Sequence, residues 1–130
     1  MFIDASAIVA LLTREVEADD LLKRLEAALN PITSPIAIFE AVLALCGKRR
    51  ATVDETRRDV SDFLNLVGIA IVPITEGDAV TALSAFARYG KGKGHPAQLN
   101  LGDCFAYAVA KNHHVSLLFN GGDFSETDIV

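Results

Sequence analysis

The sequence has only two cysteines, Cys46 and Cys104, so it has no disulfide framework. We expect both to be reduced thiols, which predicts a cytoplasmic protein. No apolar run reaches the roughly 18 residues that a membrane-spanning helix needs. The first apolar stretch is interrupted by Asp4 and has no basic segment before it, so we expect no signal peptide. These absences predict a protein that acts inside the cell and not in a membrane.

Positive charge is also scarce. Lysine and arginine number 12 against 17 aspartate and glutamate residues, which gives a net charge of −5. The chain therefore lacks the general basic field of many nucleic-acid-binding proteins. An acidic protein that binds a polyanion needs local basic patches or bound divalent cations. The length and the hydrophobic content of 51% predict one globular domain over residues 1–130.

Short apolar segments alternate with amphipathic ones along the chain. The predicted strands are residues 1–3, 31–33, 68–73 and 115–119, and we expect residues 68–73 (GIAIVP) to be buried. The predicted helices are residues 5–12, 15–29, 35 to about 46, 52–66, 75–89 and a last one within 99–114. In the second helix we place Val16, Leu21, Leu22, Leu25, Ala28 and Leu29 on the inward side. Helix starts are marked by Ser34 before Pro35, by Thr52 with Glu55 and by Thr75 with Asp78.

Short strands that are separated by helices cannot pair through hairpins, so the sheet should be largely parallel. The sequence therefore predicts the α/β class, as a three-layer α/β/α sandwich with a short-stranded central sheet.

Two acidic residues follow predicted strands. Asp4 comes directly after the first strand, and Asp123 lies a few residues beyond the last one, in FNGGDF. Parallel sheets bind ligands at the carboxyl ends of their strands, so both can reach one crevice if these strands are neighbours. Each also has a simpler explanation, because Asp4 can cap the helix at residues 5–12 and Asp123 can be a turn residue.

Two more acidic residues lie on predicted helices. Glu40 is the only charged residue between Asn30 and Gly47, which is unusual for an exposed stripe, although it can be the visible edge of a covered helix. Asp103 falls three positions after Asn100, where it can complete a helix cap. Four carboxylates in one place repel each other unless a cation neutralises them, and oxygen ligands favour Mg²⁺ or Mn²⁺. The four acids make a metal-dependent phosphotransfer site plausible.

The sequence resembles the PIN-domain ribonucleases, in particular the VapC-type toxins of bacterial toxin–antitoxin pairs. The resemblance covers nearly the whole chain and rests on MFIDASAIVA, IAIFEAVLAL, GHPAQLNLGDCFAYAVA and LLFNGGDFSETDI. It implies a PIN-like fold and a Mg²⁺ or Mn²⁺ site that cleaves single-stranded regions of RNA.

The resemblance also implies roles for individual residues. Asp4 and Asp103 are the expected direct metal ligands, Glu40 binds a second ion or orients the attacking water, and Asp123 acts through water. Ser6 is expected to hold a water or the substrate phosphate, or else simply to satisfy backbone groups of the first helical turn. Asn120 is expected near the scissile phosphate, but many members have Thr or Ser with Asn here, whereas this chain has Phe119 and Asn120. That departure leaves open whether one metal ion or two are bound.

Basic residues must hold the RNA. The expected phosphate contacts are Lys48, Arg49 and Arg50, which follow the helix that carries Glu40, together with Lys91, Lys93 and His95 in a glycine-rich loop. Each of these can instead be a solvated loop residue or a favourable charge at a helix end. The resemblance further implies a homodimer and a cognate antitoxin whose C-terminal segment fills the active groove.

Other protein classes fit less well. A phosphatase of the haloacid-dehalogenase type needs a second acid where this chain has Ser6, and a receiver domain needs an aspartate after the strand at residues 68–73. A PIN-fold module that binds antitoxin or nucleic acid without cutting it stays open as the alternative.

Overall fold

A computed structural model describes residues 1–129 of the chain. In these residues the elements follow in the order β1 (Phe2–Ile3), α1 (Ala5–Leu12), α2 (Ala18–Glu26), β2 (Ile32–Thr33), α3 (Pro35–Arg49), α4 (Val53–Val67), β3 (Ala70–Ile71), α5 (Glu76–Tyr89), α6 (Leu101–Asn112) and β4 (Leu117–Leu118). None of these helices combines the length and the hydropathy that a membrane crossing requires.

The four strands form one parallel sheet in the order β3-β2-β1-β4. Phe2 of β1 pairs with Ile32 on one side and with Leu117 on the other. The first and last strands are therefore neighbours, which is the condition under which Asp4 and Asp123 can reach one crevice. Because all strands run the same way, the segments that leave β1 and β4 emerge together at one edge of the sheet.

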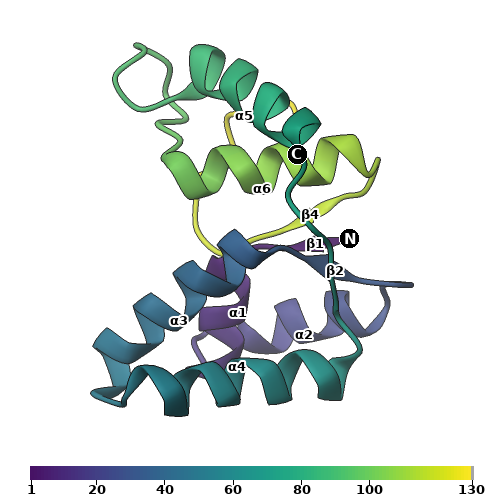
Figure 1. Cartoon of the computed structure of the whole chain (residues 1–130), viewed down its shortest axis with the longest axis vertical. Helices are drawn as coiled ribbons and strands as arrows, with labels where there is room; N and C mark the ends of the chain where they lie inside the picture. Colours follow the sequence, from purple (N-terminus) through teal and green to yellow (C-terminus); the bar gives the residue numbers. More distant parts are fainter. Residues whose placement is uncertain (130) are drawn as a thin grey trace.

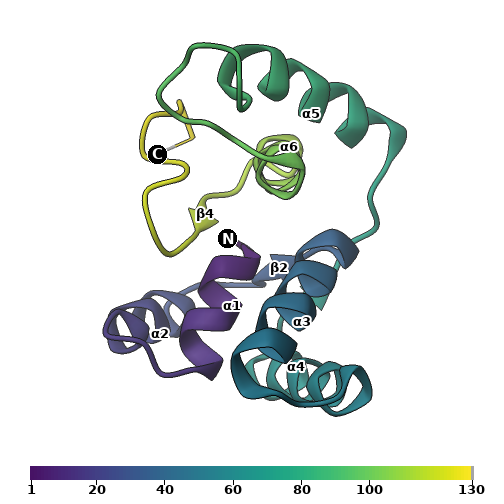
Figure 2. The ribbon, with the colours of Figure 1, turned by 90° about the vertical axis from the view of Figure 1, so that its left-hand side faces the viewer.

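Helices cover both faces of the sheet (Figures 1 and 2). α6 lies on one face and α5 packs across it, whereas α1, α2, α3 and α4 lie on the other face. Successive side chains of a strand point to opposite faces, so Phe2 enters the core beneath α5 and α6 while Ile3 enters the core with α1 and α3. The predicted three-layer α/β/α sandwich is confirmed.

The helix starts follow from side-chain caps that the sequence contains. Ser34 Oγ accepts a hydrogen bond from Ala37 N at 3.2 Å, and Thr52 Oγ1 accepts one from Glu55 N at 3.1 Å. Thr75 and Asp78 form a reciprocal capping box at the start of α5. These side chains satisfy backbone N–H groups that have no partner inside the helix, so local chemistry fixes where each helix begins.

Two expectations about the elements are wrong. β3 is not a buried strand, because Ala70 and Ile71 are both exposed at the edge of the sheet. A run of β-branched residues does not reveal whether helices cover the strand. α2 is shorter than residues 15–29, and Val16 and Leu29, expected inside, are 97% and 87% exposed. Leu21 and Leu25 alone form the buried stripe of this helix.

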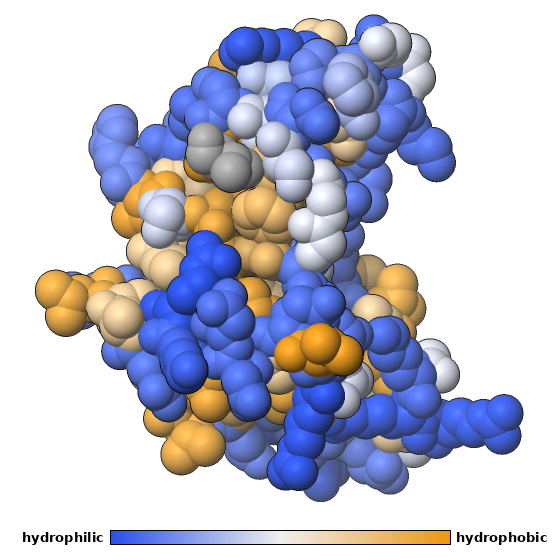
Figure 3. Space-filling view, turned by 180° about the vertical axis from the view of Figure 1, so that it is seen from behind, coloured by the Kyte–Doolittle hydropathy of each residue, from blue (hydrophilic) through white to orange (hydrophobic). Residues whose placement is uncertain are grey.

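The surface seen from behind carries mostly hydrophilic side chains, and apolar side chains gather across the middle of this view (Figure 3). Residues 119–129, which follow β4, have no regular secondary structure. Phe124 anchors this segment, because it is buried and its ring lies 5.2 Å from the ring of Phe119. Tyr107 Oη and Lys111 Nζ donate to the Asp128 carboxylate at 2.6 and 2.9 Å. These contacts place the segment that carries Asp123.

Candidate active site

One pocket brings together residues that are far apart in the sequence. Its volume is about 350 Å³, and it lies where β1 and β4 end, between α3 and the start of α6. It is lined by Asp4, Ala5, Ser6, Val9, Glu15, Glu40, Ala44, Lys48, Asn100, Asp103, Asn120 and Asp123. All four carboxylates singled out from the sequence are in this set. Ser6 and Asn120 are there as well.

Asp4 follows β1 and caps α1. Its Oδ2 accepts hydrogen bonds from Ser6 N at 3.1 Å and from Ser6 Oγ at 2.6 Å. Only 5% of the residue is exposed, and this burial raises the pKa of its carboxyl group, against the lowering effect of the Ser6 hydrogen bonds. Asp4 is therefore both a helix cap and a pocket carboxylate, so the two readings of this residue do not exclude each other.

Glu40 projects from α3 onto the first turn of α6. The space for its carboxylate exists because residue 102 is glycine: a Cβ atom there would overlap the Glu40 carboxylate. Burial raises the pKa of Glu40 to about 7, and the negative charges of Asp4 and Asp103 add to the increase. At neutral pH this side chain is thus poised between its protonated and charged forms.

Asp103 lies in the first turn of α6. Asn100 N donates to Asp103 Oδ2 at 3.1 Å, and Asp103 N donates to Asn100 Oδ1 at 2.9 Å, so the two residues form a capping box. Burial raises the pKa of Asp103 to about 6; the bond from Asn100 lowers it, and the charges of Asp4 and Asp123 raise it. The helix cap that the sequence indicated places this carboxylate in the pocket.

Asp123 and Asn120 reach the pocket from the segment after β4. Asn120 N donates to Ser6 Oγ at 2.9 Å, and Ser6 in turn donates to Asp4. Asp123 is exposed, but its charge still acts on the pKa of Asp4 and of Asp103. Ser6 therefore connects the segment after β4 to the buried carboxylate after β1. Its hydroxyl does more than satisfy backbone groups of its own helix.

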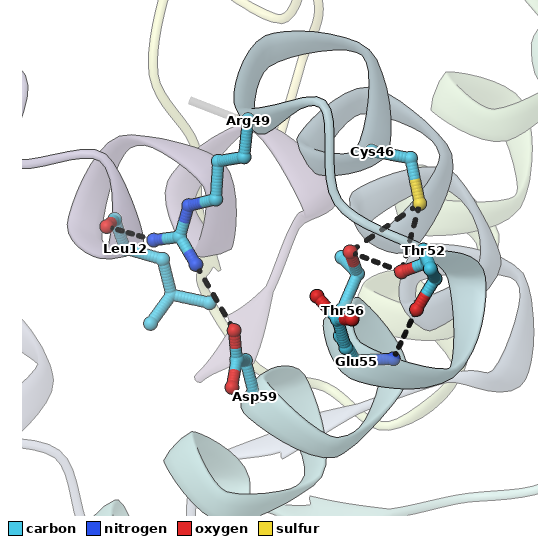
Figure 4. A network of polar contacts seen from close by, with 7 residues as sticks. All are labelled: Leu12, Cys46, Arg49, Thr52, Glu55, Thr56 and Asp59. Atoms are coloured by element: carbon cyan, nitrogen blue, oxygen red, sulfur yellow. Dashed lines mark hydrogen bonds and ion pairs between the residues drawn. The ribbon is translucent and has the colours of Figure 1, made fainter.

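Of the predicted phosphate contacts, Lys48 lines the pocket and the others do not. Arg49 is held elsewhere: its guanidinium donates to Leu12 O and pairs with Asp59 at 3.3 Å (Figure 4). His95 packs edge-on against Tyr89, with ring centroids 4.8 Å apart. Neither residue lines the pocket, and neither does Lys91 or Lys93, so their contact with RNA stays a prediction.

Glu15 is a pocket residue that sequence reasoning missed. Its Oε1 accepts a hydrogen bond from Lys48 Nζ at 3.0 Å, and its Oε2 accepts one from Asn120 Nδ2 at 2.8 Å. We assigned residue 15 to an amphipathic helix, whereas it lies in the connection between α1 and α2. Its partners are 33 and 105 residues away, so no local pattern marks it.

The donor set fits a hard divalent cation by its chemistry. Burial and mutual repulsion raise the pKa values of Asp4, Glu40 and Asp103, and a positive charge would relieve both effects. Carboxylate oxygens suit Mg²⁺ or Mn²⁺ better than thiophilic metals. Within residues 1–129, no three His, Cys, Asp or Glu side chains have the spacing of a formed metal centre. Mg²⁺ commonly binds through one or two carboxylates and keeps several waters, so a pair of these side chains is enough to hold it.

Comparison with known proteins places the chain in a described family. The family model for the PIN domain matches residues 1–130. A VapC ribonuclease of Rhizobium meliloti is 45% identical over 139 residues, which cover 98% of this chain and 98% of that protein. Ribonuclease VapC42 of Mycobacterium tuberculosis is 39% identical, with 99% of this chain and 96% of that protein covered.

Two solved structures share the fold. The Mycobacterium tuberculosis toxin VapC20, described as cleaving the sarcin–ricin loop, matches with a TM-score of 0.75 and 18% identity over 99% of this chain and 95% of its own. A chain of a toxin–antitoxin complex from Klebsiella pneumoniae matches with a TM-score of 0.69 and 20% identity over 98% of this chain and 92% of its own. At these identities the match shows the architecture of the chain.

Proposed function

The chain belongs to the PIN-domain family, among the VapC ribonucleases, and from this premise we propose that it is the endoribonuclease toxin of a toxin–antitoxin pair. It cleaves single-stranded regions of RNA and depends on Mg²⁺ or Mn²⁺. The observation that carries the proposal is the single pocket in which the carboxylates of Asp4, Glu40, Asp103 and Asp123 meet. Two free cysteines, which stay reduced in the cytosol, agree with action in the cytoplasm.

Each acidic side chain has a proposed part in holding the ion. Asp4 and Asp103 are the direct ligands, because they are the most buried of the four and most in need of a counter-charge. Glu40 faces both across the first turn of α6 and is placed to bind a second ion or to orient water. Asp123 is exposed and acts through water.

In the reaction, water attacks the phosphorus, the P–O bond to one nucleoside breaks, and the departing oxygen takes a proton from solvent. A divalent ion, when bound, supplies positive charge against the phosphate and lowers the pKa of water. The Glu40 carboxylate can take the proton of the attacking water, because it lies in the same pocket as Asp4 and Asp103. Ser6 keeps Asp4 in place through its hydroxyl, and Asn120 is joined to the same chain of hydrogen bonds.

The partner of the toxin is proposed to be a cognate antitoxin protein. α3 and α4 present exposed apolar side chains, among them Phe39, Leu43 and Val53, around a groove of about 420 Å³. An exposed apolar patch of this kind is typical of a protein-binding surface. An antitoxin arginine that reached the acidic pocket would supply charge in place of the cation. The protein is also proposed to form a homodimer.

The alternative is a PIN-fold module that binds antitoxin or RNA and does not cut. The two functions differ in one observable, the appearance of new RNA ends in the presence of metal. The raised pKa values of Glu40 and Asp103 favour the enzyme, because repelling carboxylates cost stability and have no use in a silent module.

Cleavage of labelled single-stranded RNA by the purified protein tests the proposal. Mg²⁺ or Mn²⁺ should support cutting and EDTA should stop it. Asp4→Asn or Asp103→Asn should lower the rate by about a hundredfold or more, because each removes a charge that meets the ion. Asp62→Asn, on the exposed side of α4, is the matched control and should leave the rate unchanged. Equal cutting by Asp4→Asn, Asp103→Asn and the parent protein would refute the assigned roles.

A further inference from the structure

A single lysine lies among the carboxylates of the acidic pocket. The lining residues include five acids (Asp4, Glu15, Glu40, Asp103 and Asp123) and one cation, Lys48. An RNA strand must bring several phosphates toward this concentration of negative charge. A metal ion offsets the charge of the reacting phosphate, but a neighbouring phosphate needs a cation of the protein. Among the lining residues, Lys48 is that cation.

Glu15 fixes the position of this lysine. The Lys48 side chain is 52% exposed and would otherwise sample many rotamers, but its ammonium donates to Glu15 Oε1 at 3.0 Å. An ammonium group has three N–H bonds, so two remain for a ligand. Exposed ion pairs contribute little to stability, so fold stability alone is a weak explanation for this pair.

The same carboxylate also binds a second lining residue of the pocket, Asn120. Asn120 Nδ2 donates to Glu15 Oε2 at 2.8 Å, and the backbone of Asn120 is joined through Ser6 to Asp4. One continuous chain of hydrogen bonds thus runs from Lys48 on α3 to the buried Asp4. Glu15 itself is anchored by its backbone N–H, which donates to Ala10 O at 3.0 Å.

The neighbouring arginine provides a contrast. Arg49 follows Lys48 on the same helix, yet its guanidinium is committed to Asp59 and Leu12 O (Figure 4). Successive residues on a helix point in directions about 100° apart, so one of the two reaches the pocket and the other stabilises the contact between α1, α3 and α4.

We propose that Lys48 binds a phosphate of the RNA beside the scissile one, and that Glu15 is a positioning residue that holds Lys48 and the Asn120 carboxamide at the rim of the pocket. The inference rests on the proposed ribonuclease function and adds two residues to it. Glu15 has opposite effects on RNA, since its charge repels phosphate while its hydrogen bonds order the groups that bind phosphate. Whether removal of the Glu15 side chain weakens or strengthens the interaction with RNA therefore shows which of these two effects is larger.

The first test measures the contribution of Lys48. Binding of a fluorescent single-stranded RNA is followed in Mg²⁺ over a salt series, in proteins that all carry Asp103→Asn to stop cleavage. Lys48→Ala should weaken RNA binding about tenfold. It should also make the negative slope of log K against log salt less steep by about 0.7, the value for one phosphate contact on a single strand. Lys23→Ala, an exposed lysine on α2 away from the pocket, is the matched control and should change neither quantity.

The second test measures positioning by Glu15. With catalytically intact protein, Glu15→Ala should raise KM severalfold and change kcat less. Glu17→Ala removes the same charge two residues away, outside the pocket, and should leave KM unchanged or slightly lower. In a Lys48→Ala background, most of the effect of Glu15→Ala should disappear, because the two residues act as one unit. If Glu15→Ala fails to fold, Glu15→Gln keeps the shape and one acceptor oxygen and should show a smaller rise in KM.

The outcomes separate this inference from the proposed function. If the parent cuts RNA but Lys48→Ala behaves like Lys23→Ala, the inference is overturned and the function stands. If Glu15→Ala leaves KM unchanged, or lowers KM as much as Glu17→Ala does or more, the role of Glu15 is overturned. If the parent binds RNA but does not cut it, and Lys48→Ala still makes the salt dependence of binding less steep, the ribonuclease proposal fails and the phosphate contact stands.

Discussion

Replacing Glu40 by glutamine should stabilise the metal-free protein at alkaline pH. The carboxyl group has a pKa raised from 4.5 to about 7, and each pKa unit is worth about 1.4 kcal/mol. A group whose pKa is higher in the folded state stabilises the fold fully below its unfolded pKa and loses that contribution as pH rises through the folded pKa. The free energy of unfolding of the parent should therefore fall by up to about 3 kcal/mol between pH 4 and pH 8, because the Glu40 carboxyl loses its proton.

Glutamine imitates the protonated form and does not titrate. We expect Glu40→Gln to be more stable than the parent by up to about 3 kcal/mol at pH 8 and by about 1 kcal/mol at pH 5. Urea unfolding in EDTA at the two pH values, followed by circular dichroism, measures the difference. Glu26→Gln, an exposed residue at the end of α2, is the control and should change stability little and equally at both pH values.

Magnesium should reverse the order of stability. Bound cation favours the charged carboxylate, so at pH 8 Mg²⁺ should stabilise the parent more than Glu40→Gln. If Glu40→Gln is less stable than the parent at pH 8 in EDTA, the Glu40 carboxylate is not repelled by Asp4 and Asp103, and the electrostatic account of the pocket is refuted.

Two further predictions concern the surroundings of the acids. Gly102→Ala should displace the Glu40 carboxylate and lower the cleavage rate at least about tenfold, while the free energy of unfolding stays the same or rises by up to about 1 kcal/mol, because alanine favours the helix. Gly47→Ala, where a Cβ meets nothing, is the control, and a full rate in Gly102→Ala would contradict the close approach. Phe124→Ala should cost about 3 kcal/mol and weaken Mn²⁺ binding, because Phe124 anchors the segment that carries Asp123; unchanged Mn²⁺ affinity would show that Asp123 is placed otherwise.

Most of the fold could be predicted because its signals are local. Helix starts depend on side chains that cap backbone N–H groups two or three residues away, as Ser34, Thr52 and Thr75 do. The alternation of short apolar strands and helices was sufficient to predict a parallel sheet. Whether a strand is covered depends on distant elements, so the burial of β3 was predicted wrongly.

In the site, too, local sequence features could be predicted and contacts between distant residues could not. The four acids could be singled out because each stands at a strand end or on a helix with few other charges. Their gathering in one pocket follows from the parallel sheet, since its strands end at a common edge. Glu15 could not be found this way, because its hydrogen bonds join it to Lys48 and Asn120, and only the tertiary fold brings the three together. Arg49 is a basic residue whose charge is used within the fold, which its place in the run 48–50 does not reveal.

The central claim, that the buried carboxylates hold a divalent ion, is tested most directly by crystals of the protein soaked in Mn²⁺ and measured at the manganese absorption edge. The account predicts an anomalous peak in the acidic pocket with oxygen atoms of Asp4 and Asp103 as ligands, and no such peak in Asp103→Asn crystals. A pocket without a peak at saturating Mn²⁺, or a peak of equal height in Asp103→Asn, would contradict it.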